Sequence, residues 1–149
     1  MIVMRLRAAA TGALSAFALN WAWENAQAFL YKDYAGFAQH VWGCTIATFG
    51  DVAIVAAIWA AVAVLWRDID WHRRAGAGQY LAAILIGVAV AFAIEYWALA
   101  SGRWAYAGMP LVPYTGIGLA PILQMVVPPP IVFGIMGIAG RERRRGAGA

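Results

Sequence analysis

The chain has 149 residues, of which 64% are hydrophobic and 12% are charged, and its formal net charge is +4. A soluble domain of this length carries about 25% charged residues, so the composition excludes an ordinary soluble core and predicts a single transmembrane domain covering residues 1–149. The positive charges form short clusters beside apolar runs and lack accompanying base-reading groups, so we expect no nucleic-acid partner.

Four apolar segments follow one another along the chain, and each can cross a hydrocarbon layer of about 30 Å as a helix. They cover residues 8–30, 41–66, 80–100 and 116–138. So few segments must be helical, because unpaired backbone groups cannot face lipid. We therefore predict an all-α, four-helix transmembrane bundle. Its fourth helix should be broken by Pro128–Pro130, because proline lacks a backbone donor and clashes with the preceding turn.

The first segment has a second interpretation, as a secretory signal. The apolar run 8–19 follows two arginines and precedes Ala26-Gln27-Ala28, which has the A-x-A form of a cleavage site. The bulky Trp21 and Trp23 and the charged Glu24 stand where small neutral residues are usual before such a site. Cleavage would also leave three spans, which conflicts with the charge pattern, so we favour an uncleaved first helix.

Lysine and arginine are distributed very unevenly among the connections. Nine of the eleven lie before the first segment, between the second and third, or after the fourth, and only Lys32 and Arg103 lie in the other two connections. The positive-inside rule then places both termini and the 67–79 connection in the cytoplasm. The chain is expected in a bacterial inner membrane, with the basic run Arg141–Arg145 anchored on anionic lipid. We assign no chemistry to the charged 67–79 connection.

Polar residues cluster by angle on the predicted helices, at about 100° per residue. One face of the first helix carries Asn20, Glu24 and Gln27, and one face of the second carries His40, Cys44, Thr48 and Asp51. The third helix contributes Glu95 and the fourth contributes Gln124. All of these residues fall in the outer halves of their helices, so we predict a single polar pocket below the outer surface of the membrane.

The carboxylates in this set are the main functional candidates, because burying a charge in a bilayer costs at least about 2.5–3.5 kcal/mol. Three carboxylates in one apolar layer cannot all be ionised cheaply, so at least one should be protonated or paired with Arg103 or His40. We predict Glu24 and Asp51 as a catalytic acid–base pair, with His40 and Glu95 tuning them.

Substrate contacts are predicted around this pair. In the connection after the third helix, Arg103, Trp104 and Tyr106 combine a cation with two aromatic rings, which suits a lipid headgroup; Arg103 could instead fold back to Glu95. The remaining candidates for substrate binding are Asn20, Gln27, Thr48, Gln124 and Trp23. For the four polar residues in this list, we favour a structural role, in which their side chains form hydrogen bonds between helices.

We expect no cofactor. The only cysteine, Cys44, excludes an internal disulfide. Because His40 and Cys44 are four residues apart on one helix face, they could share a metal ion with Asp51. The chain has no dense Cys/His motif, so a metal site is the weaker alternative.

Three functions remain open. The leading hypothesis is an intramembrane enzyme that acts on a lipid, prenyl or other amphiphilic substrate without a nucleotide. A transporter or channel subunit is the first rival; because four helices are few for a transport path, it would require a homo-oligomer. The second rival is a non-catalytic protein that binds membrane lipids or assists assembly.

Overall fold

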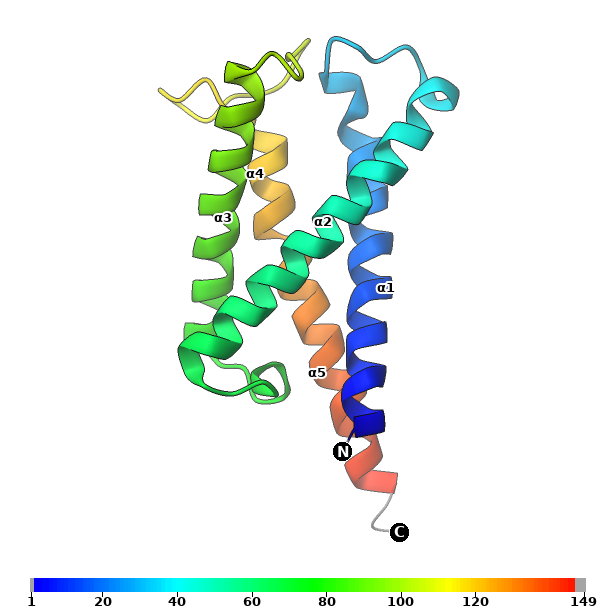
Figure 1. The fold of residues 1–149 in the computed structure, drawn as a ribbon, viewed down its shortest axis with the longest axis vertical. Coiled ribbons are helices and arrows are strands. Elements are labelled where there is room, and N and C mark those ends of the chain that lie inside the picture. The colour runs from blue at the N-terminus through cyan, green and yellow to red at the C-terminus, as the bar shows by residue number, and fades with distance from the viewer. Residues whose placement is uncertain (1, 147–149) are drawn as a thin grey trace.

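The computed structural model describes the backbone of residues 2–146 and the side chains of residues 3–139. The predicted lipid anchor Arg141–Arg145 therefore lies outside the described side chains. The described chain is helical, as Figure 1 shows. Its elements are α1 (Ile2–Gln27), η1 (Ala28–Leu30), α2 (Phe37–Trp66), η2 (Trp71–Arg73), α3 (Ala77–Ala100), α4 (Leu119–Val126) and α5 (Pro128–Gly146).

Three helical stretches are long and apolar enough to cross a membrane. They are Phe37–Trp66, Ala77–Ala100 and Leu119–Ala139, the last of which joins α4 to the first part of α5. Large apolar side chains such as Trp42, Phe49 and Leu85 point outward from α2 and α3 and are exposed, which suits lipid contact. The all-helical membrane architecture is thus confirmed. α1 is comparably long but has arginines at one end and Glu24 at the other. That α1 crosses the membrane therefore stays a prediction.

The helices differ from the predicted segments mainly at their starts. α2 begins at Phe37 rather than at 41, and α3 begins at Ala77 rather than at 80. The early start of α3 is stabilised by a cap. The Gln79 side chain accepts a hydrogen bond from the Gly76 amide at 3.0 Å, which satisfies a donor at the beginning of the helix. The fourth segment instead starts late, at Leu119, because Gly116 adopts a positive φ of 71°.

The predicted break in the fourth helix is confirmed, and it falls at Val127, between α4 and α5. Pro128–Pro130 form the first turn of α5, where amide donors have no intrahelical partner and proline is tolerated. The Met125 carbonyl thereby faces α3 at Gly87, where a Cβ atom would lie only 2.6 Å from the oxygen. Only glycine allows this close approach.

The face of α3 that meets α4 carries small side chains and one carboxylate. Its buried residues are Ala83, Gly87, Ala91, Glu95 and Ala98. Gly87, Ala91, Glu95 and Ala98 are four, four and three residues apart, so they share one face of α3. It brings Glu95 to the interior of the bundle.

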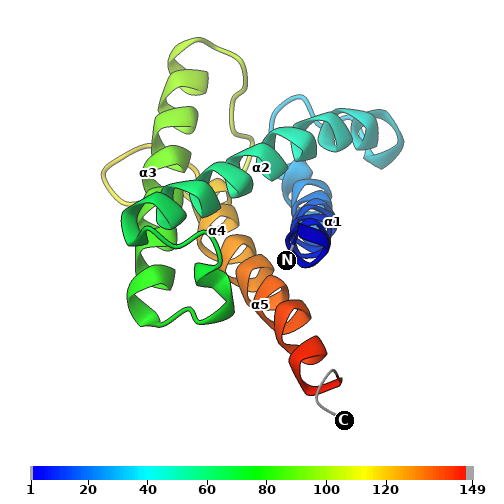
Figure 2. The same cartoon turned by 60° about the horizontal axis from the view of Figure 1, so that its bottom comes forward.

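The tilt of α2 decides where cavities form. In Figure 1, α2 crosses the molecule diagonally, lying against α1 at the end that carries the 28–36 and 101–118 connections and against α3 at the opposite end. The start of α1, the 67–76 connection and the last part of α5 share that opposite end, as Figures 1 and 2 show. These ends are called outer and inner below, following the charge-based prediction.

Between the two ends, an apolar core packs the helices against one another. Its buried members include Val55, Ile58 and Val62 of α2 and Phe133 of α5. The outer ends are tied together by an antiparallel bridge between Tyr31 and Tyr106. This bridge holds the 101–118 connection over the outer ends of the helices.

Candidate functional site

A pocket of about 440 Å³ lies in the outer half of the molecule, where α2 diverges from α3. α1, α2, α3, α4 and the 101–118 connection all contribute to its lining. Gly43 and Ala47 of α2 and Ile94 of α3 also line it, and Gly43 and Ala47 are exposed. The pocket is therefore open at the surface of α2 and polar within.

The Gln124 side chain stands at the centre of the polar lining. Its amide nitrogen lies 2.9 Å from Glu24 Oε1 and 3.0 Å from Asp51 Oδ2. Two carboxyl oxygens that share one donor are within about 6 Å of each other, close enough for strong coupling between their charges. The predicted contact between carboxylates of the first two helices is thus present, and an amide from the fourth segment mediates it.

A second amide extends this network. Gln27 donates from Nε2 to Glu24 Oε1 at 3.0 Å and to Gln124 Oε1 at 2.9 Å. The remaining oxygen of Gln27 is buried and has no partner among the described residues. Buried acceptors are nearly always satisfied in native proteins. This oxygen therefore offers a position for a donor such as water or a substrate hydroxyl at the edge of the pocket.

Glu95 lines the same pocket but has different partners. It accepts hydrogen bonds from the Tyr106 hydroxyl and from Trp104 Nε1, the latter at 3.3 Å. The Tyr106 oxygen in turn accepts from the Gly118 amide at 2.9 Å. Burial, and next the Glu95 carboxylate, raise the pKa of Tyr106, so the phenol remains a donor at neutral pH. Glu95 is held in place by the 101–118 connection.

Neither of the predicted cations pairs with these buried carboxylates. Arg103 is exposed at the mouth of the pocket, with its guanidinium 5.1 Å from the centre of the Trp97 ring. His40 lies at the rim, 4.0 Å from the exposed carboxylate of Asp33. The predicted pairing of a buried carboxylate with Arg103 or His40 is therefore not found. Both cations lie near the outer end of the molecule, where Arg103 contacts Trp97 and His40 lies beside Asp33.

Several predicted substrate contacts stand behind the lining rather than in it. Asn20 donates to the Ala16 carbonyl and Thr48 to the Cys44 carbonyl, both within their own helices. Trp23 joins α1 to α4 through a 3.2 Å bond from Nε1 to the Ala120 carbonyl. These three side chains position the helices. Among the predicted substrate-binding residues, Arg103, Trp104, Gln27 and Gln124 do line the pocket.

The alternative metal site is not assembled. Within residues 3–139 no group of three or more His, Cys, Asp or Glu side chains could hold a metal ion. Cys44 is buried, and its sulfur lies 3.7 Å from the Glu24 carbonyl oxygen. The set of His40, Cys44 and Asp51 therefore fails because the spacing along α2 does not bring the three side chains to one point.

Sequence reasoning missed Tyr31 as a lining residue. Its ring packs against Tyr106 at 5.8 Å and Trp104 at 6.3 Å between ring centres. Burial, and then the nearby carboxylates of Glu95 and Glu24, raise the pKa of Tyr31. A signal was available, because Glu24, Gln27 and Tyr31 follow the helical spacing of three and then four residues.

No protein-family model, curated protein or solved structure matches the chain. The function must be argued from the site itself. Three carboxyl groups from three helices, two side-chain amides and a phenol surround a pocket that is open at the surface of α2. This arrangement can move protons and can receive an apolar chain.

Proposed function

We propose that the protein is an intramembrane acid–base enzyme, located in the bacterial inner membrane, whose substrate is a lipid, a prenyl chain or another amphiphile. The observation that carries this proposal is the joint hydrogen bonding of Glu24 and Asp51 to the amide nitrogen of Gln124. A pair of carboxyl groups that holds one proton contains both an acid and a base. Pairs of this kind perform acid–base chemistry in many enzymes.

The shape of the pocket favours an amphiphile. Gly43 and Ala47 of α2 are exposed lining residues, and an apolar chain would enter past them from the bilayer. Arg103 stands at the outer mouth with an exposed guanidinium, which can bind an anionic headgroup bidentately. Tyr31 and Trp104 flank the mouth with aromatic surface. The substrate would thus lie with its chain across the carboxyl pair and its head toward Arg103.

The reaction that fits this arrangement is a proton shift on the substrate chain. One carboxyl group of the Glu24–Asp51 pair gives its proton to a carbon of a double bond. The other, as a carboxylate, removes a proton from a neighbouring carbon, so that the double bond moves or a ring forms and the pair keeps one proton. No nucleotide and no electron acceptor are needed.

Transport is disfavoured by the inner half of the bundle. A proton or cation path would have to continue from Asp51 to the inner surface. Instead, Val55, Ile58 and Val62 lie buried in succession along α2 beyond Asp51. No ionisable side chain follows Asp51 along α2 before the helix ends at Trp66, so a relay of protons or cations would have no titrating group on this helix.

Native mass spectrometry of the purified protein in mild detergent tests substrate binding at this pocket. We expect Ala47→Phe to carry one bound amphiphile fewer than the wild-type protein, because a phenyl ring at this lining position fills the outer pocket. Ala53→Phe is the matched control, since Ala53 is an exposed alanine of the same helix that does not line the pocket. Equal retention by all three proteins would contradict the proposal.

A further inference from the structure

A second cavity, of about 350 Å³, lies at the inner end of the molecule, where α1 and α2 have diverged. α5 forms its floor, and the 67–73 segment closes its end. Its upper walls are apolar and mostly small, with Ala9, Ala13 and Ala16 on one side and Val55 and Ala56 on the other. Its lower end is polar, because Arg5, Asp70 and His72 line it there.

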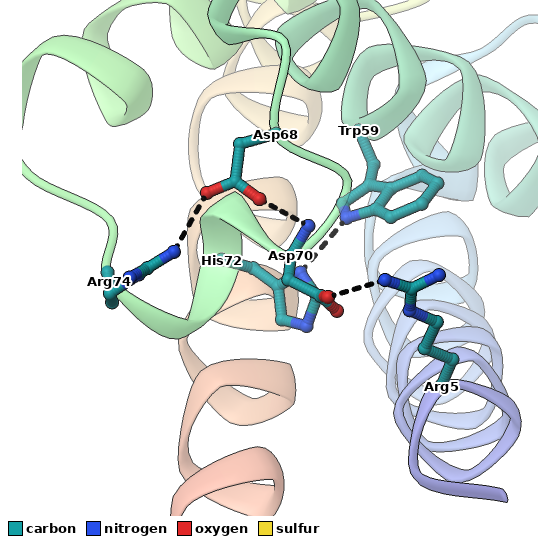
Figure 3. A network of polar contacts seen from close by, with 6 residues as sticks. All are labelled: Arg5, Trp59, Asp68, Asp70, His72 and Arg74. Carbon is teal, nitrogen blue, oxygen red and sulfur yellow. Dashed lines mark hydrogen bonds and ion pairs between the residues drawn. The ribbon is translucent and has the colours of Figure 1, made fainter. Parts of the chain in front are cut away.

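His72 is the unusual member of this lining. The sequence placed it in a charged connection without chemistry, but the structure buries it, with 4% of its surface exposed. Nδ1 accepts a 3.3 Å hydrogen bond from the Trp59 indole, as Figure 3 shows. The backbone around His72 is fixed as well, because its carbonyl packs against Gly137 so closely that a Cβ atom there would lie 2.5 Å away.

The other imidazole nitrogen has no partner. Nε2 of His72 is buried and makes no hydrogen bond with any described residue. Burial lowers the pKa of His72, so the ring is neutral at physiological pH. Since Nδ1 accepts from Trp59, the single ring proton resides on Nε2. A buried N–H donor at the polar end of an apolar cavity requires an acceptor oxygen.

The charges at this end restrict the kind of acceptor. Arg5 and Asp70 form an ion pair at 3.0 Å beside His72, shown in Figure 3. Because Asp70 already neutralises Arg5, the cavity end carries no net positive charge from this pair. An uncharged carbonyl oxygen fits better than a carboxylate, which Asp70 would repel.

From the unpartnered Nε2 of His72 and the apolar walls above it, we propose that the inner cavity binds an acyl chain of a membrane phospholipid. The chain lies along α1 toward Ala16, and its ester carbonyl accepts the hydrogen bond from Nε2. The headgroup then faces the inner surface beside Arg5. This site is separate from the outer carboxylate pocket and does not depend on the function proposed for it.

The test uses the delipidated full-length protein in detergent, with phosphatidylglycerol and palmitate, each labelled with ¹³C at the carbonyl carbon, as alternative ligands. Native mass spectrometry measures affinity, and infrared spectroscopy measures the carbonyl frequency. We expect phosphatidylglycerol to bind with a carbonyl band shifted to lower frequency. His72→Phe should abolish the shift and weaken binding about tenfold, as loss of one hydrogen bond implies.

A second variant protects the test against misfolding of His72→Phe. Ala56 is exposed and lines only this cavity, so Ala56→Phe should block phosphatidylglycerol binding while Ala53→Phe, on the same helix, should not. Tighter binding of palmitate than of phosphatidylglycerol would overturn the assignment of an ester. Equal binding by wild-type and Ala56→Phe proteins, or an unshifted carbonyl band in the wild-type complex, would overturn the site itself.

Discussion

Glu24 of α1 and Asp51 of α2 are held by the same nitrogen atom, the side-chain amide of Gln124 in α4. This relationship joins three helices at one point and places two carboxyl groups side by side at the wall of the outer pocket. The amide nitrogen has only two hydrogens. Its longer contact, 3.2 Å to Asn20, therefore competes with the two carboxylates for them.

Replacement of Gln124 by leucine should destabilise the protein. The change removes the donor for both carboxylates and the acceptor for Gln27, leaving buried polar groups unpaired at a cost of about 1–3 kcal/mol each. The free energy of unfolding, measured in mixed micelles, should fall by at least about 2 kcal/mol. Leu123→Ala, at a neighbouring lipid-facing position, is the control and should change it far less. A Gln124→Leu protein as stable as this control would show that the bridge contributes nothing.

Tyr106→Phe should loosen the 101–118 connection, because the hydroxyl donates to Glu95 and accepts from the Gly118 amide. We expect a loss of about 1–3 kcal/mol in unfolding free energy. Tyr114→Phe removes an exposed phenol of the same connection and should be neutral.

The same phenol gives a pH dependence with a definite sign. The folded-state pKa of Tyr106 is raised above its ordinary value of 10.0, so the folded protein holds this proton more firmly than the unfolded chain. The resulting stabilisation is complete below about pH 10 and decreases as the pH rises further. Melting temperatures should therefore fall above about pH 10, less steeply in Tyr106→Phe. An identical slope in both proteins would contradict the buried phenol.

Gly87→Ala tests the close approach of α3 to the broken fourth helix. A methyl group at Gly87 would meet the Met125 carbonyl oxygen at 2.6 Å, and such overpacking costs about 1–3 kcal/mol. Gly78→Ala on the same helix is the control, since its nearest contact is an ordinary 3.6 Å to the Trp66 ring. We expect Gly87→Ala to lower the midpoint of thermal unfolding and Gly78→Ala to leave it unchanged or raise it.

Topology follows from the charge asymmetry. Reporter fusions after Asp33 and after Tyr106 should report an external location, and fusions after Arg74 and Ala149 should report the cytoplasm. A further fusion at the N-terminus that reports the cytoplasm would, together with the result after Asp33, establish α1 as a membrane span. An external C-terminus would reverse the orientation and place the carboxylate pocket on the inner side of the membrane.

Periodicity and charge in the sequence were enough to predict the helices, the break before Pro128 and the meeting of Glu24, Asp51 and Gln124. These features depend on spacing within one helix and on a shared depth in the membrane. The partners of Arg103 and His40 were not predictable, because they depend on the path of the connections. The burial of His72 was not predictable for the same reason, because it depends on how η2 packs against α5.

The proposed proton shift is tested most directly by deuterium incorporation. Protein in vesicles made from the total lipid of its native membrane is incubated in D₂O, and the recovered lipids are examined by mass spectrometry for deuterium bound to carbon. The account predicts incorporation into an amphiphilic lipid with the wild-type protein and none with Glu24→Gln or Asp51→Asn, each of which removes one member of the pair. The absence of carbon-bound deuterium with the wild-type protein, or equal incorporation with both variants, would contradict an acid–base enzyme.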